Sequence, residues 1–121
     1  MSFGNQNFGF ERPNLAVIGK EILIDFRIPG VQSSGIASAE WVLSLTNPEE
    51  ESGGSALITK TVGAGIVLVN NNDDVLAQLT VDGDDTTGFS PGIYFHRLDY
   101  VDTGGSLHEA ARGLGKLTRR L

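Results

Sequence analysis

Residues 91–101 have the sequence PGIYFHRLDYV, in which large side chains alternate between the two faces of an extended chain. Tyr94 and His96 share one parity, and Phe95 and Arg97 share the other. Alternation with period two is typical of a β-strand, and the Pro-Gly pair at its start is typical of a preceding turn. This stretch therefore predicts a strand near the end of the chain.

The same alternation recurs upstream, in runs separated by Gly, Pro, Asn or Asp about every eight to twelve residues. The predicted strands cover residues 22–27, 39–46, 57–61, 66–69, 75–81 and 93–101. No stretch has the pattern of a long amphipathic helix. Short strands at this spacing predict an all-β sandwich of about seven antiparallel strands.

Residues 106–112 fit two structures. The segment Ser106–Glu109 matches a helix capping box, and the next three residues are helix formers. However, the strand over 93–101 needs a hairpin partner, and a helix this short is weak by itself. We expect a strand here, with a short helix as the alternative.

Composition and charge limit the class of protein to which this chain can belong. The chain has 121 residues, 40% of them hydrophobic and none of them cysteine, which fits one globular domain without disulfides or thiolate metal sites. No apolar run approaches the roughly 18 residues of a membrane span. All 15 acidic residues precede the basic C-terminal tail, which carries Lys116, Arg119 and Arg120. The acidic body disfavours nucleic acid as a partner.

The first 14 residues are predicted to form an N-terminal arm, because Phe3, Phe8 and Phe10 lie among Gly, Asn and Gln. The arm either packs on its own domain, docks on a partner subunit or is disordered. We therefore divide the chain into an arm at 1–14 and a sandwich at 15–121 that ends in the basic tail. The predicted partner contacts are Phe3, Phe8, Phe10, Lys116, Arg119 and Arg120.

We expect no catalytic residue, no cofactor and no metal. The carboxylates of Asp82–Asp85 do not continue into a calcium-binding loop, because the sixth and twelfth positions are Thr87 and Ile93. Residues 113–117 resemble a phosphate loop only faintly, since Leu follows the lysine. Neither histidine has a metal-ligand spacing, and no motif marks a nucleophile.

Tyr94 and Trp41 have predicted structural roles. In immunoglobulin-type sandwiches, a tyrosine near the start of the sixth strand bonds to upstream main chain, two residues before a cysteine. Tyr94 fits that position, with His96 in place of the cysteine, and Trp41 fits the large buried residue of the facing sheet. We expect the Tyr94 ring to be buried and its hydroxyl to bond main chain near Asp84–Gly88.

Several pieces follow one another in a fixed order: Gly19-Lys20, Ala39–Leu43, Leu57–Lys60, Gly63–Ile66, Val75–Val81, Asp85-Thr86, Phe89–Tyr94 and Gly113–Gly115. This ordered set resembles the small immunoglobulin-like structural proteins of tailed phages, including the amino-terminal domain of phage baseplate upper proteins. The resemblance covers residues 15–118.

The resemblance implies a subunit of the bacteriophage virion that binds other virion proteins, of capsid or of tail and baseplate, and forms homo-oligomers there. Since no receptor-binding domain is expected beyond Leu121, capsid decoration (cement) or a head–tail adaptor is the first expectation. A baseplate or tail-fibre adaptor is the alternative. An alternative of another class is a soluble sugar- or peptide-binding module that uses the loops at 70–74 and 82–87.

Overall fold

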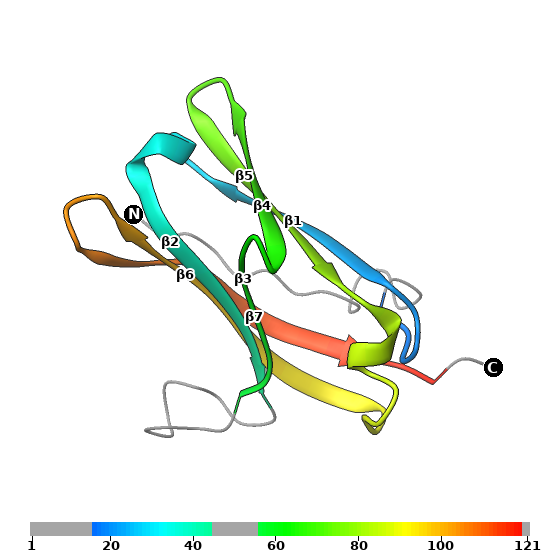
Figure 1. Cartoon of the computed structure of the whole chain (residues 1–121). Helices are drawn as coiled ribbons and strands as arrows, with labels where there is room; N and C mark the ends of the chain where they lie inside the picture. The colour runs from blue at the N-terminus through cyan, green and yellow to red at the C-terminus, as the bar shows by residue number, and fades with distance from the viewer. Residues whose placement is uncertain (1–15, 45–55, 120–121) are drawn as a thin grey trace.

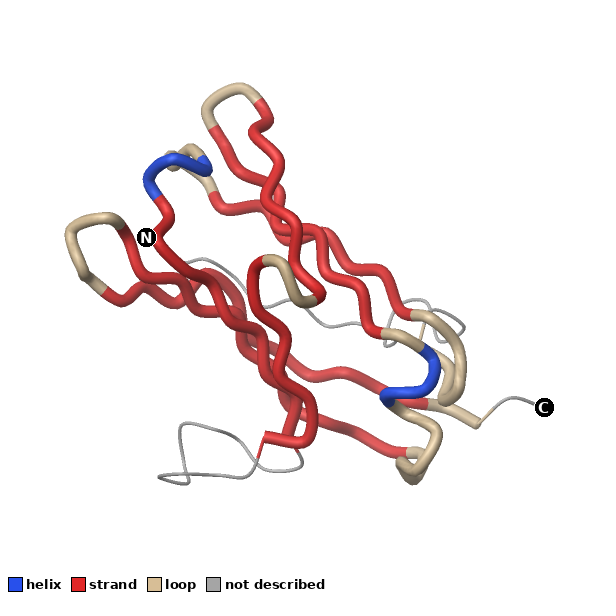
Figure 2. The backbone as a smooth tube through the Cα atoms, in the orientation of Figure 1, coloured by secondary structure: helices blue, strands red, loops and turns tan. Residues whose placement is uncertain are grey.

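The computed structural model describes residues 16–44 and 56–119 and shows an all-β protein (Figure 1, Figure 2). Its seven strands are β1 (Ile22–Ile28), β2 (Ile36–Ser44), β3 (Ala56–Val62), β4 (Gly65–Asn71), β5 (Asp74–Val81), β6 (Gly92–Asp102) and β7 (Leu107–Leu117). The 3-10 turns η1 (Ser33–Gly35) and η2 (Gly83–Asp85) lie between strands. The all-β prediction is confirmed. Within the described residues, no helix is long and apolar enough to cross a membrane.

The predicted strands are present, except that β2 begins at Ile36 rather than at 39 and that residues 45–46 of that prediction lie outside the described residues. The strand β5 shows why alternation predicts a strand. Val75, Ala77, Leu79 and Val81 are buried, whereas the residues between them are half-buried or exposed. One apolar parity turned to the core is what stabilises a strand of this kind. Asn72 closes the hairpin between β4 and β5 with φ 58°, a left-handed conformation that asparagine tolerates.

Hydrogen bonds join all seven strands in one sheet, in the order β1-β5-β4-β3-β2-β6-β7. Neighbouring strands are antiparallel except β3 and β4, which pair in parallel through Thr61–Gly65 and Val62–Ile66. The expectation of antiparallel strands throughout is therefore wrong at this one pair. The cause is the turn between them, where Gly63 (φ 86°) and Gly65 (φ 112°) let the chain loop over itself without reversing direction.

The sheet is folded over a single core. β1 lies at one end of the hydrogen-bonded order and β6 lies near the other end, yet the rings of Phe26 and His96 are only 5.9 Å apart. In Figure 1, β1, β4 and β5 lie across from β2, β6 and β7. The largest apolar side chains that are fully buried in the core are Trp41, Phe26, Ile28, Leu43, Ile66, Leu79, Leu98 and Leu117. Complete burial of each aliphatic or phenyl side chain contributes about 1.5–3 kcal/mol.

Residues 107–117 form the strand β7, so the strand expected over 106–112 is confirmed and the helix alternative is wrong. β7 pairs with β6 along its length, and the register shifts between Leu98 and Asp99 because Ala110 is an extra residue. At this β-bulge, Ala110 and Ala111 are both buried, with 2% and 3% of their surface exposed. Two consecutive residues facing the core need small side chains, which explains the pair of alanines in a strand.

The described chain begins and ends side by side. Val17 and Thr118 form a parallel bridge, and the amide of Ile18 donates to the carbonyl of Thr118 over 2.9 Å. Ala16 is fully buried. The predicted arm at 1–14 lies outside the described residues.

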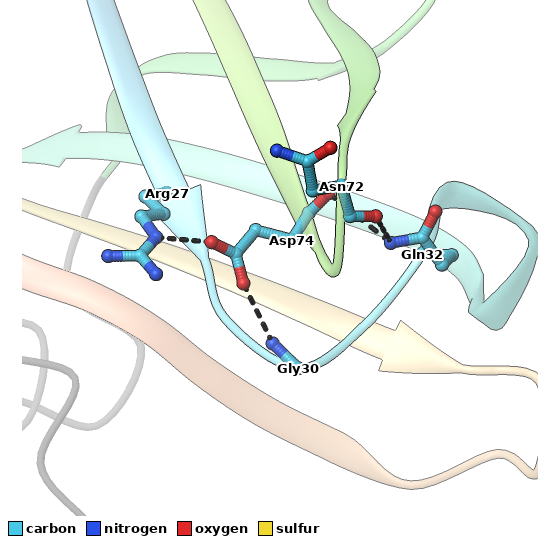
Figure 3. A network of polar contacts seen from close by, with 5 residues as sticks. All are labelled: Arg27, Gly30, Gln32, Asn72 and Asp74. Atoms are coloured by element: carbon cyan, nitrogen blue, oxygen red, sulfur yellow. Dashed lines mark hydrogen bonds and ion pairs between the residues drawn. The ribbon is translucent and has the colours of Figure 1, made fainter.

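A polar network ties the start of η1 to the hairpin between β4 and β5 (Figure 3). Asp74 accepts from the side chain of Arg27 and from the amide of Gly30, and the Gln32 side chain donates to the Asn72 carbonyl over 2.6 Å. The Arg27 contact holds the pKa of the Asp74 carboxyl below its usual value. Because these contacts are exposed, they order two loops more than they stabilise the fold.

Candidate functional site: the β6–β7 face

The structure describes only part of the predicted partner-contact set. Phe3, Phe8, Phe10 and Arg120 lie outside the described residues. Lys116 is exposed on β7, directly opposite Ile93 of β6, and Arg119 is exposed just after the strand.

Tyr94 is buried, with 4% of its surface exposed, and its hydroxyl donates to the main-chain carbonyl of Ser90 over 2.6 Å. The bond goes to upstream main chain as expected, and its acceptor lies two residues beyond the segment 84–88 near which it was predicted. The ring of Phe89 stacks on the Tyr94 ring at 5.6 Å, which places the hydroxyl beside the next residue, Ser90.

Trp41 is buried and directly opposite Leu98 in the pairing of β2 with β6. Its indole Nε1–H donates to Nδ1 of His96 over 3.2 Å, inside the core. Because Nδ1 accepts this bond, His96 is the neutral tautomer that carries its proton on Nε2. His96 is thus a packed core residue rather than a group presented to a ligand.

His108 lies in a different place, at the turn between β6 and β7. Its Nε2 is 2.8 Å from the carboxylate of Asp102, and its ring stacks on Tyr100 at 4.8 Å. The other Asp102 oxygen accepts from the amides of Gly104 and Ser106, which closes the turn. These bonds, chiefly the one from His108, hold the pKa of the Asp102 carboxyl below its usual value.

The acidic segment at 82–85 has structural partners. Asp82 and Asp85 form a reciprocal capping box around η2, and Asp85 also accepts from the ammonium group of Lys60 over 2.8 Å. The Lys60 contact lowers the pKa of the Asp85 carboxyl. Across 16–44 and 56–119, no group of three or more His, Cys, Asp or Glu residues could hold a metal ion.

The most distinctive surface is the outer face of β6 and β7, which we call the β6–β7 face. From Val101 back to Phe95, the outward residues of β6 are apolar, acidic, basic and apolar, and the antiparallel β7 has that order from Leu107 to Leu114. Strand pairing places each residue opposite its equivalent, as Val101–Leu107, Asp99–Glu109, Arg97–Arg112 and Phe95–Leu114. The β-bulge makes this match possible: Glu109 and Arg112 are three positions apart and would otherwise face opposite ways.

Opposite charges are paired along each strand of this face. The guanidinium of Arg97 lies 2.8 Å from the carboxylate of Asp99, and that of Arg112 lies 2.6 Å from Glu109. Across the strands the charges are alike, since Asp99 is directly opposite both Glu109 and Glu40 of β2. Burial raises the pKa of the Asp99 carboxyl above its usual value; Arg97 opposes this shift, and Glu109 and Glu40 add to it.

Apolar side chains flank the charges at both ends of the face. Leu107 has 70% of its surface exposed, the highest value among the exposed large apolar residues of the described chain, and Ile93 has 51%. Val101 and Phe95 are half-buried. The face therefore has exposed apolar side chains near its ends and ordered charges between them.

Sequence reasoning placed Phe95, Arg97 and Asp99 on one parity of the strand but gave that parity no function. The missing information was the register between β6 and β7, which depends on the turn at 103–106 and on the β-bulge. A second local feature is a hollow at the end of the sheet, lined by Ile18, Thr87, Gly88, Phe89, Ser90 and Arg119.

No protein-family model and no curated protein matches this chain. Among solved structures, it is similar to the extracellular domain of the voltage-gated sodium channel beta4 subunit, with 13% identity, 100% of this chain and 96% of that chain covered, and a TM-score of 0.38. It is also similar to murine CRIg, with 12% identity, 88% and 90% of the two chains covered, and a TM-score of 0.39. Likeness at this level says nothing about what the chain binds.

Proposed function

We propose that this chain is a non-catalytic structural subunit, an immunoglobulin-like sandwich that binds other protein subunits in a tailed-phage particle. The observation that carries the proposal is the β6–β7 face, where exposed Leu107 and Ile93 flank paired charges on an outward sheet surface. A rigid sheet holds these side chains in fixed positions, as a subunit contact requires.

The strand arrangement supports the immunoglobulin-like part of the proposal. The folded sheet has two halves, β1-β5-β4 and β3-β2-β6-β7. They correspond to the B-E-D and C′-C-F-G sheets of that architecture. Antibody domains place a disulfide between strands B and F against a tryptophan. Here Phe26 and His96 occupy the matching strands, with Trp41 bonded to His96.

The phage part of the proposal is supported by the ordered resemblance along residues 15–118. Capsid decoration or a head–tail adaptor is the first proposal, and a baseplate or tail-fibre adaptor is the alternative. Its partners are then other virion proteins, and its location is the virion.

Electron microscopy of purified particles, with gold label on a C-terminal tag, tests this function. Label on the head supports decoration, label at the neck supports the head–tail adaptor, and label at the tail tip supports the baseplate alternative. Particles without the tagged chain contradict the proposal. An untagged particle stock is the control for nonspecific label.

The other class, a soluble sugar- or peptide-binding module, is favoured by one observation. The hollow beside Phe89 combines an aromatic ring with the guanidinium of Arg119, two groups that ligands of this kind use. Titration of the labelled chain with oligosaccharides and short acidic peptides, followed by NMR, tests it. Shifts confined to Thr87–Ser90 at micromolar ligand would replace the structural proposal.

A further inference from the structure

We propose that two copies of this chain associate through their β6–β7 faces around a two-fold axis. The axis lies in the interface, perpendicular to the strands, and passes between Asp99 and Arg97. The inference rests on the proposed function as a protein-binding subunit and names one partner, a second copy.

The order of side chains on β6 fits such an axis. Four successive outward residues are Val101, Asp99, Arg97 and Phe95, at steps of about 6.8 Å, and Ile93 faces outward one step beyond Phe95. Rotation about the midpoint of this series exchanges the acidic residue with the arginine and exchanges the two apolar ends. The Asp99 carboxylate of one copy therefore meets the Arg97 guanidinium of the other, twice, as a two-fold interface requires.

The outward residues of β7 have the same order of apolar, acidic and basic side chains, and the midpoint of their series lies beside that of β6. Leu107, Glu109, Arg112 and Leu114 are paired with the β6 residues one to one. The rotation places Glu109 of one copy against Arg112 of the other. Because two neighbouring strands carry matching series, the charge pattern is complementary to itself over a surface rather than along a line.

A second copy also relieves an unfavourable feature of the single chain. Within one copy, Asp99 is directly opposite Glu109, and Arg97 is directly opposite Arg112. Like charges directly across a strand pair are destabilising. In the pair of chains, each row of carboxylates lies against a row of arginines.

The apolar ends complete the match. Leu107, which is 70% exposed, and Val101 of one copy face Phe95 and Leu114 of the other. Apolar contact therefore flanks the ion pairs at both ends of the strands.

Reversing the charge of Arg97 or Asp99 tests the position of the proposed two-fold axis. We expect the wild-type chain to self-associate in sedimentation velocity, and more weakly as salt is raised, because ion pairs are screened. Arg97→Asp and Asp99→Arg, each alone, should associate about tenfold or more weakly, since like charges then meet. An equimolar mixture of the two variants should associate again, because the two faces are then complementary.

Lys20→Asp, a charge reversal of an exposed residue outside the face, is the matched control and should associate like wild type. Thermal melts show which variants are folded. If one variant does not fold, Leu107→Asp tests the same interface at its apolar end and should also abolish self-association. A monomeric wild-type chain, or folded variants whose mixture stays monomeric, overturns the inference. If the chain is monomeric but its tag is found on the particle, only this inference is overturned. If the chain self-associates but is absent from the particle, only the proposed function is overturned.

Discussion

The corner between β5 and β6 depends on a few individual residues. Thr86 is fully buried; its hydroxyl oxygen accepts from the amide of Gly19 over 2.9 Å and its hydroxyl donates to the carbonyl of Gly83. Tyr94 fixes the other side of the corner through Ser90. These contacts hold the entry to β1 against the turn that follows β5.

Replacing Tyr94 with phenylalanine should lower the free energy of unfolding by about 0.5–1.5 kcal/mol, the usual net value of one hydrogen bond. The ring would stay packed against Phe89, so the fold should be unchanged. Urea unfolding of the variant and the wild type measures the difference. Equal stabilities would mean that the bond to Ser90 does not contribute.

Gly83→Ala should be more damaging, because a Cβ at that position would lie 2.4 Å from the carbonyl oxygen of Gly19. The backbone must shift to relieve this overlap, so we expect a loss of about 1–3 kcal/mol. Gly88→Ala is the matched control, since its Cβ would have no atom within 4 Å. Similar thermal melts for the two variants would contradict the close approach.

At the scale of elements, the β-bulge in β7 determines which side chains face the core. Ala111→Leu should destabilise the chain by about 1–3 kcal/mol, because the added atoms have no space in a close-packed interior. Lys116→Leu adds the same kind of side chain at an exposed position of the same strand and should change stability little. Chemical denaturation of both variants decides whether Ala111 is packed as described.

The elements also show what the sequence could predict. Runs such as Val75–Val81 keep their alternation whatever their neighbours are, so strand positions followed from residue pattern alone. The parallel pairing of β3 with β4 depends on the loop conformation at Gly63–Gly65, and the β-bulge depends on pairing with β6. The charged rows of the β6–β7 face could not be predicted, because they exist only once the registers of β2, β6 and β7 are set.

At the scale of the whole molecule, Lys60 and Asp85 connect two parts of the chain that are 25 residues apart in the sequence. Lys60 lies on β3, and Asp85 lies in the turn after β5. Lys60 lowers the pKa of the Asp85 carboxyl, so the ion pair stabilises the fold fully above the usual Asp value of 3.8. That contribution is lost as the pH falls below this value and through the lower pKa of the folded chain.

Lys60→Met should therefore lower stability at pH 7 by about 0.5–1 kcal/mol, the value of a partly exposed pair. At pH 2 to 3, the difference from wild type should shrink as Asp85 becomes protonated. Urea unfolding at several pH values gives both quantities. A difference independent of pH would show that Lys60 acts through packing rather than charge.

The predicted arm is tested on the complete chain. We expect a chain without residues 1–12 to fold, because the described residues from Ala16 onward already form one core of buried side chains. We also expect it to lose most of its binding to the particle, because Phe3, Phe8 and Phe10 are predicted partner contacts. A thermal melt checks folding, and occupancy on purified particles checks binding. Normal occupancy would remove the arm from the mechanism and leave the β6–β7 face as the contact.

Trp41, whose indole donates a hydrogen bond to His96 in the core, is an intrinsic fluorescence probe of folding. Trp41 is the chain's one tryptophan, so fluorescence excited at the indole band comes from a single site in the core. Emission at short wavelength indicates an indole shielded from water. A shift to long wavelength indicates that water has entered between the two halves of the folded sheet. Each unfolding experiment above can thus be followed by tryptophan fluorescence without an added dye. The signal comes from the position where the two halves of the sheet separate.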